Sequence, residues 1–199
     1  MIKRILPGLA LLAAPAPALA HELISQYGAF LGPAIHIFTE IDHLAAFTVV
    51  GLLAGQNKAP ARTYGVVAFL IALVLGMVAP LGLEGLGAFE FVEGLLSAAS
   101  VLVTAMLVAA GMRLPAWLIA LVSAALGLVH GIANGLAIAG SPWLMGSMLG
   151  AGIAALVIAV VSVLIAAASS GLRGRLVVRV IGSWVAALSL LLIGLALRG

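Results

Sequence analysis

Long apolar runs separated by short polar breaks form the dominant pattern along this chain. The breaks hold glycine, proline, amide, serine and basic residues, as at Gln56-Asn57-Lys58 and Gly140-Ser141-Pro142. Between the breaks the pattern predicts helices over residues 33–55, 63–82, 90–111, 115–138, 143–168 and 177–197. Each predicted helix has about 20–26 residues, which is enough to cross the hydrocarbon core of a bilayer with some tilt.

The runs are apolar on every side of a helix, as in Ala116 to Leu128 and Leu149 to Ala168. Strands of a membrane barrel would instead alternate apolar and polar residues. The composition agrees with a membrane protein: 65% of residues are hydrophobic, 8% are charged, and the mean hydropathy is +1.35. A soluble domain has roughly a quarter of its residues charged. We therefore expect an all-α fold, a polytopic membrane bundle of about six transmembrane helices.

The first twenty residues have the pattern of a cleavable signal peptide. Lys3 and Arg4 precede the apolar run 5–14, and Ala18-Leu19-Ala20 is a small-x-small cleavage site directly before His21. The alternative is an uncleaved first helix, but the run is too short to span the bilayer, and Pro7, Pro15 and Pro17 would each disturb a helix. We expect a signal peptide over residues 1–20 and a single transmembrane domain over residues 21–199.

Charge placement predicts the orientation of the bundle. If the mature N-terminus is outside, the loops after the first, third and fifth helices face the cytoplasm. These loops hold Lys58, Arg62, Arg113, Arg173, Arg175 and Arg179, whereas Arg198 alone lies outside. This bias satisfies the positive-inside rule and accounts for the formal charge of +3. We expect a multi-pass protein of the bacterial inner membrane with both mature termini in the periplasm.

Small residues recur every four positions on two of the predicted helices. Gly127, Gly131 and Gly135 form one ridge, and Gly146 and Gly150 begin another that continues to Ala154. Such ridges let helix backbones approach closely in lipid. We expect these two helices to pack tightly in the bundle.

Six ionisable side chains lie inside or at the edge of the apolar spans: His36, Glu40, Asp42, His43, Glu93 and His130. Groups of this kind are costly in a membrane and are functional candidates by default. All six fall in the outer half of the predicted bundle. On a regular helix His36, Glu40 and His43 share one stripe, while Asp42 points about a third of a turn away. Imidazoles with carboxylates suit Ni, Co, Zn or Cu, and Asp42 could orient a ligating histidine.

Each of these residues also has a structural interpretation. His36 and Glu40 could be solvated groups at the membrane interface, and Asp42 with His43 could form a structural ion pair. Glu93 could be a carboxylate stabilised by the dipole at a helix N-terminus, and His130 could form a hydrogen bond between helices.

The sequence contains no cysteine, so thiolate sites and disulfides are excluded.

The run His36-Ile37-Phe38-Thr39-Glu40-Ile41-Asp42-His43, followed by Gly51-Leu52-Leu53-Ala54, resembles the signature of the HupE/UreJ family. The family's pattern is H-P-x-x-G-x-D-H in the first helix after a signal peptide. Phe91-Val92-Glu93 resembles its glutamate at the start of the third helix. His130-Gly131-Ile132-Ala133-Asn134-Gly135 resembles its later H-G-x-A-H-G motif. The resemblance implies a membrane accessory protein of hydrogenase or urease systems, regarded as a nickel or cobalt permease, with metal ligands His36, Asp42, His43, Glu93 and His130.

Three positions depart from the family's pattern. Ile37 replaces its proline and Glu40 replaces its glycine, so we expect a straighter first helix with one additional carboxylate. Asn134 replaces the second histidine of the later motif and is not expected to be a ligand. Glu40 and His21 are further candidate ligands.

Together these features predict a metal-ion permease or metal-handling membrane protein for Ni²⁺ or Co²⁺, supporting urease or hydrogenase maturation. A non-transporting metal chaperone or a structural subunit of a membrane complex is the alternative, and a haem protein or intramembrane enzyme is a weaker one. The sequence lacks H-E-x-x-H and G-x-S-x-G motifs, so we expect no enzyme. We expect no tightly bound cofactor and no nucleic-acid partner. The expected partners are a divalent metal ion, the lipid bilayer, and either further copies of the chain or metalloenzyme maturation proteins.

Overall fold

The computed structural model describes residues 16–81 and 88–198, without the side chains of residues 16–21, 88–91 and 93. Its helices are α2 (Ala16–Thr39), α3 (Ile41–Gly55), α4 (Ala61–Val78), α5 (Ala88–Ala110), α6 (Ala116–Ile138), α7 (Leu144–Ala168) and α8 (Leu172–Ala196). No strand occurs in these ranges, and the all-α prediction is confirmed. Most of the predicted signal peptide, residues 1–20, lies outside the described residues.

Four helices are each long and apolar enough to cross a membrane: α4, α6, α7 and α8. The bent pair α2 and α3 makes a fifth candidate span, and the described part of α5 contains the shorter apolar helix Gly94–Ala110. The fold is therefore a helical membrane bundle, as predicted, while the count of six spans remains a prediction.

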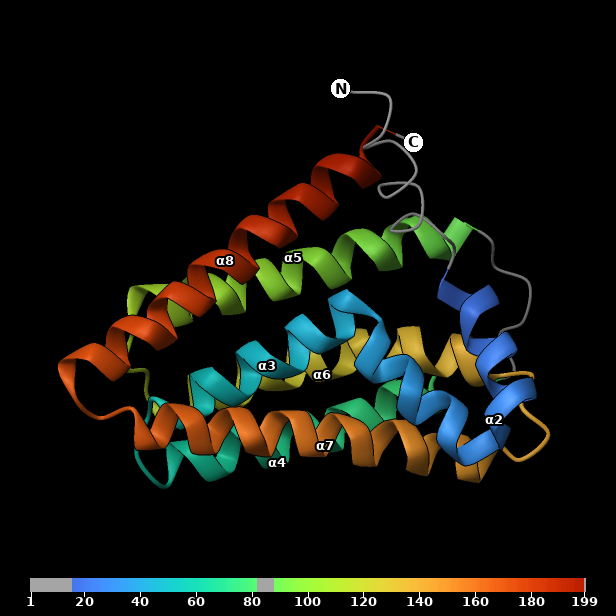
Figure 1. Cartoon of the computed structure of the whole chain (residues 1–199), viewed down its shortest axis with the longest axis horizontal. Helices are drawn as coiled ribbons and strands as arrows, with labels where there is room; N and C mark the ends of the chain where they lie inside the picture. The colour runs from blue at the N-terminus through green and yellow to red at the C-terminus, as the bar shows by residue number, and fades with distance from the viewer. Residues whose placement is uncertain (1–15, 82–87, 199) are drawn as a thin grey trace.

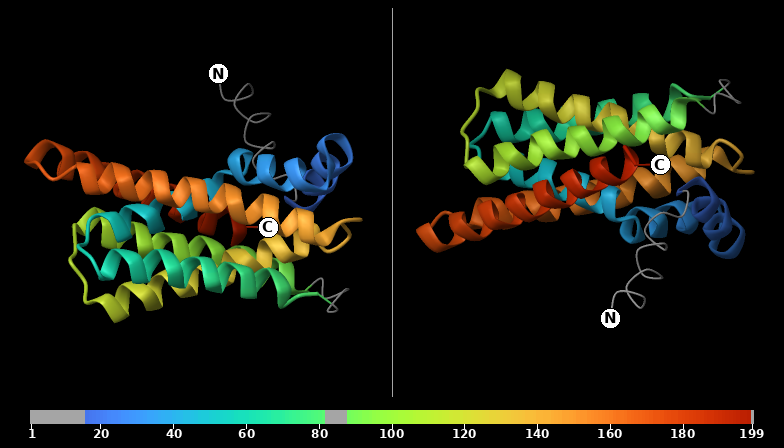
Figure 2. Two further views of the ribbon diagram at one scale, coloured as in Figure 1. Left: turned by 90° about the horizontal axis from the view of Figure 1, so that it is seen from below. Right: turned by 90° about the horizontal axis from the view of Figure 1, so that it is seen from above.

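The helices lie side by side along the length of the molecule (Figure 1). The central helix is α3, which packs against each of the other described helices. It is flanked by α7, by the pair α4 and α6, and by the pair α5 and α8, with α8 at the periphery (Figures 1 and 2). The links α3–α4, α5–α6 and α7–α8 all meet at one end of the bundle, which we name the basic end because it carries Lys58, Arg113 and Arg175.

Glycine ridges hold the central helices together. A Cβ atom at Gly127, Gly131 or Gly135 of α6 would collide with carbonyl oxygens of α4, those of Phe69, Leu73 and Met77 respectively. On α3, a Cβ at Gly51 or Gly55 would collide with the backbone of α7. The expected tight packing of α6 is therefore observed, because glycine lets the two backbones touch.

The predicted first span, residues 33–55, is wrong as a single straight helix. The chain breaks at Glu40, whose backbone is extended (φ −83°, ψ 116°), and α2 and α3 meet at 77°. Glu40 thus does not straighten the helix. Local hydrogen bonds stabilise the break: the Thr39 hydroxyl donates to the carbonyls of Ile35 and His36, at 3.0 and 3.2 Å. A second discontinuity lies at Gly28, where φ is 82°.

The last helix begins five residues earlier than predicted, at Leu172 rather than near 177. Arg173 and Arg175 therefore lie on its first turns and not in a loop. Long basic side chains are compatible with a helix end at a membrane surface, because the apolar stem can follow the helix while the charged group reaches water.

Candidate metal centre

The break at Glu40 places the start of α3 inside the bundle. Asp42 lies in the first turn of this helix, where its Oδ1 accepts a hydrogen bond from the backbone N–H of His43 at 2.8 Å. The first turn of a helix has backbone N–H groups without partners and a partial positive charge. The Asp42 carboxylate satisfies one such group and offsets that charge, which stabilises a helix start at this depth.

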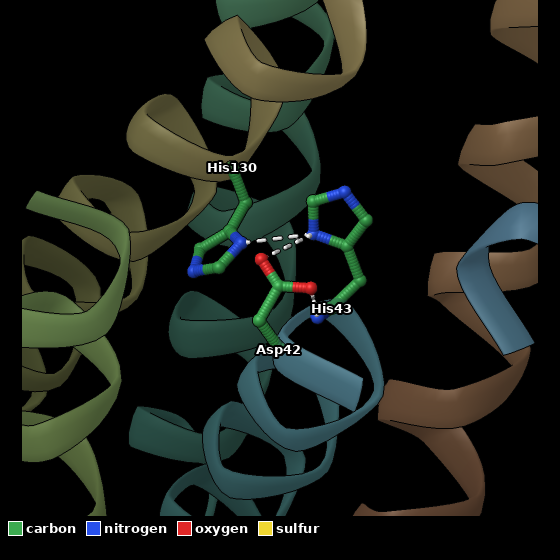
Figure 3. A group of neighbouring side chains, drawn as sticks. All are labelled: Asp42, His43 and His130. Atoms are coloured by element: carbon green, nitrogen blue, oxygen red, sulfur yellow. Dashed lines mark hydrogen bonds and ion pairs between the residues drawn. The ribbon is translucent and has the colours of Figure 1, made fainter. Parts of the chain in front are cut away.

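Three side chains from two helices converge at this point (Figure 3). Asp42 and His43 come from α3 and His130 comes from α6, and their potential ligand atoms all lie within 4.8 Å of one another. The Nδ1 atoms of His43 and His130 are 3.2 Å apart, and Oδ2 of Asp42 is 3.8 Å from Nδ1 of His43. Asp42, which the sequence places a third of a turn from the stripe of His36, Glu40 and His43, thus lies beside His43 and His130. The break at Glu40 interrupts the straight helix on which that stripe was expected.

The separation of the two imidazole nitrogens fits a shared metal ion. If both nitrogens lie ~2.0–2.1 Å from one ion, a 3.2 Å separation corresponds to an N–metal–N angle of about 100°. That angle lies between the octahedral and tetrahedral values. The same distance also fits a histidine–histidine hydrogen bond when one ring carries its proton on Nδ1 and the other does not.

A second pair lies beside this cluster. Nδ1 of His36 is 3.3 Å from Oε2 of Glu40, and the His36 ring meets the His43 ring edge-on with a centroid distance of 5.4 Å. Side-chain exposure is 2% for His36 and 4% for His43, but 21% for Glu40 and 31% for Asp42. The two carboxylates therefore form the accessible edge of an otherwise buried group of histidines.

Aromatic rings close the side of the cluster that faces the basic end. Phe47, one turn after His43, stacks nearly parallel to that ring at 5.8 Å and meets the His130 ring at 5.9 Å. Phe69 of α4 lies against Phe47 at 5.3 Å, and both phenylalanines are fully buried. Sequence analysis missed this contribution, although the four-residue spacing from His43 to Phe47 placed both on one helix face.

The remaining predicted residues have different positions. Glu93 lies on α5, one turn before Ser97, and the backbone of Ser97 faces the His130 ring. The side chains of Glu93 and His21 are outside the described residues. Asn134 is buried, and its Nδ2 donates to the His130 carbonyl at 2.7 Å. It thus interacts with its own helix, as expected of a residue that packs and forms hydrogen bonds.

The charges of the site favour a cation. Neither Glu40 nor Asp42 forms an ion pair with a lysine or arginine within the described part of the chain. Carboxylates at membrane depth are costly without a partner, and imidazole nitrogens are good ligands for divalent transition metals. Fold and site together define a polytopic helical membrane protein with a buried histidine–carboxylate cluster suited to a divalent metal ion.

The comparison with protein families identifies the family to which this chain belongs. Residues 9–192, nearly the whole chain, match the family described as HupE / UreJ protein, so the chain is a member of the HupE/UreJ family. This is an accessory family of hydrogenase and urease systems that is related to nickel and cobalt transport. The comparisons with curated proteins and with solved structures gave no match.

Proposed function

We propose that this protein is a permease that admits Ni²⁺ or Co²⁺ through the inner membrane and so supports urease or hydrogenase maturation. The observation that carries the proposal is the convergence of Asp42, His43 and His130, which come from two helices and whose ligand atoms lie within 4.8 Å. Membership of a family related to nickel and cobalt transport supports the same conclusion.

Each group has a distinct role in this proposal. His43 and His130 bind the ion through nitrogen, and Asp42 contributes charge and orients His43. The Glu40 carboxylate, at the accessible edge, receives the ion first together with the buried His36 beside it, and the ion then passes inward across the 5.4 Å between the His36 and His43 rings. We infer that the basic end faces the cytoplasm and both mature termini the periplasm. Phe47 and Phe69 must then move apart before the ion is released, and binding must be weak enough to allow release.

Uptake of radioactive nickel and cobalt into cells that lack their own importers tests this function. Cells that express the wild-type chain should accumulate the metal, while cells with His43→Ala should not. Glu22→Gln is the matched control, because Glu22 is an exposed acidic residue of α2 outside the cluster. It should accumulate metal as the wild type does.

Metal binding by the purified protein separates transport from its main alternative. If the wild-type chain binds Ni²⁺ or Co²⁺ but no uptake occurs, the protein is a metal chaperone and not a permease. If it neither binds nor accumulates metal, the histidine cluster is structural and the proposal is wrong.

A further inference from the structure

A cavity of about 490 Å³ lies at the basic end of the bundle, apart from the metal centre. Its walls are the end of α3, the α5–α6 link, the end of α7 and the first turns of α8, which meet at the left of Figure 1. Five cationic side chains line it: Lys58, Arg62, Arg113, Arg175 and Arg179. Its volume is in the range typical of small-ligand sites.

Among the described residues these cations have no acidic partner. All six acidic residues of the chain lie between positions 22 and 93, none of them in the segments that form the cavity. Among the described residues, no ion pair involves a lysine or an arginine. The positive-inside rule requires basic residues in cytoplasmic loops, but it does not require three distant segments to bring them into one cavity. The charge concentrated here is therefore unexplained by topology alone.

Three of the arginines also have a structural role, because they donate hydrogen bonds to carbonyls at helix ends. Nη2 of Arg62 donates to Gly55 and Asn57, at 3.3 and 3.1 Å, and Nε of Arg179 donates to Ala109 at 2.8 Å. Arg175 donates to Ser170. A guanidinium has five N–H groups, so most remain available.

Two basic side chains of the cavity have donor groups without a partner among the described residues. Lys58 and Arg113 are exposed, and neither side chain forms a hydrogen bond or ion pair with a described residue. These groups are free to bind a ligand from solution or from the lipid headgroup region.

Backbone N–H groups in the cavity wall also favour an anion, and side-chain hydrogen bonds hold the wall in place. Helix α8 begins in its wall, and the N-cap Gly171 provides no side chain to satisfy the first backbone N–H groups, which attract negative charge. Asn57 fastens the α5–α6 link to α3: its Nδ2 donates to Leu53 at 2.8 Å, and its Oδ1 accepts from the Leu114 N–H at 3.2 Å.

We propose that this cavity binds a phosphate group, carried either by an anionic phospholipid headgroup or by a soluble phosphate. Arginine forks match the geometry of phosphate oxygens, and basic pockets between transmembrane helices on the cytoplasmic side are suited to lipid headgroups. Bound phosphate offsets the repulsion among the five cations and stabilises the meeting point of the three links. This site is independent of the metal centre and of the proposed transport function.

Thermal unfolding of the delipidated, purified protein in neutral detergent tests this site, with three probes titrated separately. The probes are dioleoyl phosphatidylglycerol, dioleoyl phosphatidylcholine and inorganic phosphate. The test variant is Lys58→Gln with Arg113→Gln, both exposed and without structural hydrogen bonds, so that the fold is retained. Arg173→Gln is the matched control, because Arg173 is an exposed arginine at the same end that does not line the cavity.

We expect phosphatidylglycerol, inorganic phosphate or both to raise the Tm of the wild type and of Arg173→Gln. The probe that raises the Tm identifies the source of the phosphate group. The double variant should bind that probe about 25-fold more weakly, given roughly fivefold per basic group. The proposal is overturned if neither phosphate probe raises the Tm more than phosphatidylcholine does, or if the double variant responds as Arg173→Gln does. Should the double variant unfold without ligand, Lys58→Gln alone provides the same comparison, with a fivefold effect expected.

Discussion

Nδ1 of His43 lies 3.2 Å from Nδ1 of His130, although the two residues are 87 positions apart in the sequence. Both side chains are buried at a break in the central span, and the Asp42 carboxylate lies beside them. A hydrogen bond between neutral rings and a shared metal ion both fit this distance, and these two explanations differ in what substitution should do.

If the two histidines hold one ion, they act as a unit. His43→Ala and His130→Ala should each weaken Co²⁺ binding by at least about 10–100-fold, and the double variant should be little worse than either single one. The absorption spectrum of bound Co²⁺ and calorimetric titration measure this. Additive losses, or affinities equal to that of the wild type, would show that the rings do not share an ion.

The charge of Asp42 can be separated from its role at the helix start. Asp42→Asn keeps an oxygen that can accept the His43 backbone N–H, so the fold and its Tm should change little. Metal affinity should nevertheless fall about 10–100-fold, because the negative charge beside the ligands is lost. Calorimetry with Glu22→Gln as control checks this. A large fall in Tm with unchanged affinity would assign Asp42 a structural role only.

Glu40 replaces the glycine of the family pattern and interacts with His36 rather than with the three clustered residues. Glu40→Gln should therefore slow radiometal uptake more than it weakens the equilibrium affinity of the purified protein, since the three clustered ligands remain. Adding Asn134→His, which restores the second histidine of the later motif, should recover part of the uptake. Unchanged uptake in Glu40→Gln would show that this carboxylate has no part in admitting the ion.

The glycine ridge predicts a stability effect that is independent of metal. In Gly131→Ala the new methyl group would meet the Leu73 carbonyl of α4, so the bundle must shift or strain. We expect a loss of about 1–3 kcal/mol, seen as a lower Tm in detergent. Gly152→Ala is the control: Gly152 also lies within a helix, and a Cβ there has no neighbour within 4 Å among the described residues. Equal Tm values for the two variants would contradict the packing argument.

Reporter fusions test the orientation. Lys58 and the C-terminal end of α8 lie at opposite ends of the bundle (Figure 1). A reporter fused at Lys58 should be active in the cytoplasm and one fused after Arg198 in the periplasm. The reverse result would place the histidine cluster in the cytoplasmic half and would invert the proposed direction of entry.

The helical bundle could be predicted from sequence because lipid imposes a local rule. A segment that crosses the bilayer must be helical and apolar along its whole length, so each span is visible in a short stretch of residues. The predicted bounds of 115–138 and 143–168 accordingly differ by only a residue from those of α6 and α7. The ridge at Gly127, Gly131 and Gly135 was equally visible, because its four-residue period is local.

The candidate residues could also be found from sequence, since ionisable groups are rare in apolar spans. Their arrangement could not. The break at Glu40 lies in a polar stretch, Thr39-Glu40-Ile41-Asp42-His43, and polarity alone does not tell a bend from functional groups on a straight span. Hydrogen bonds from Thr39 and to Asp42 satisfy backbone groups at the break. This break separates His36 and Glu40 from Asp42 and His43, so the placement of the first two residues relative to the other two is not that of one straight helix.

Pairings between distant segments were likewise decided only by tertiary packing. The sequence placed His130 on a ridge-bearing helix but did not specify that α6 would meet both α4 and the start of α3. It placed the basic residues in three separate loops but did not show that Lys58, Arg113 and Arg179 would line one cavity. Hydropathy determines which residues leave water, whereas the shapes of the helix surfaces determine which of them meet.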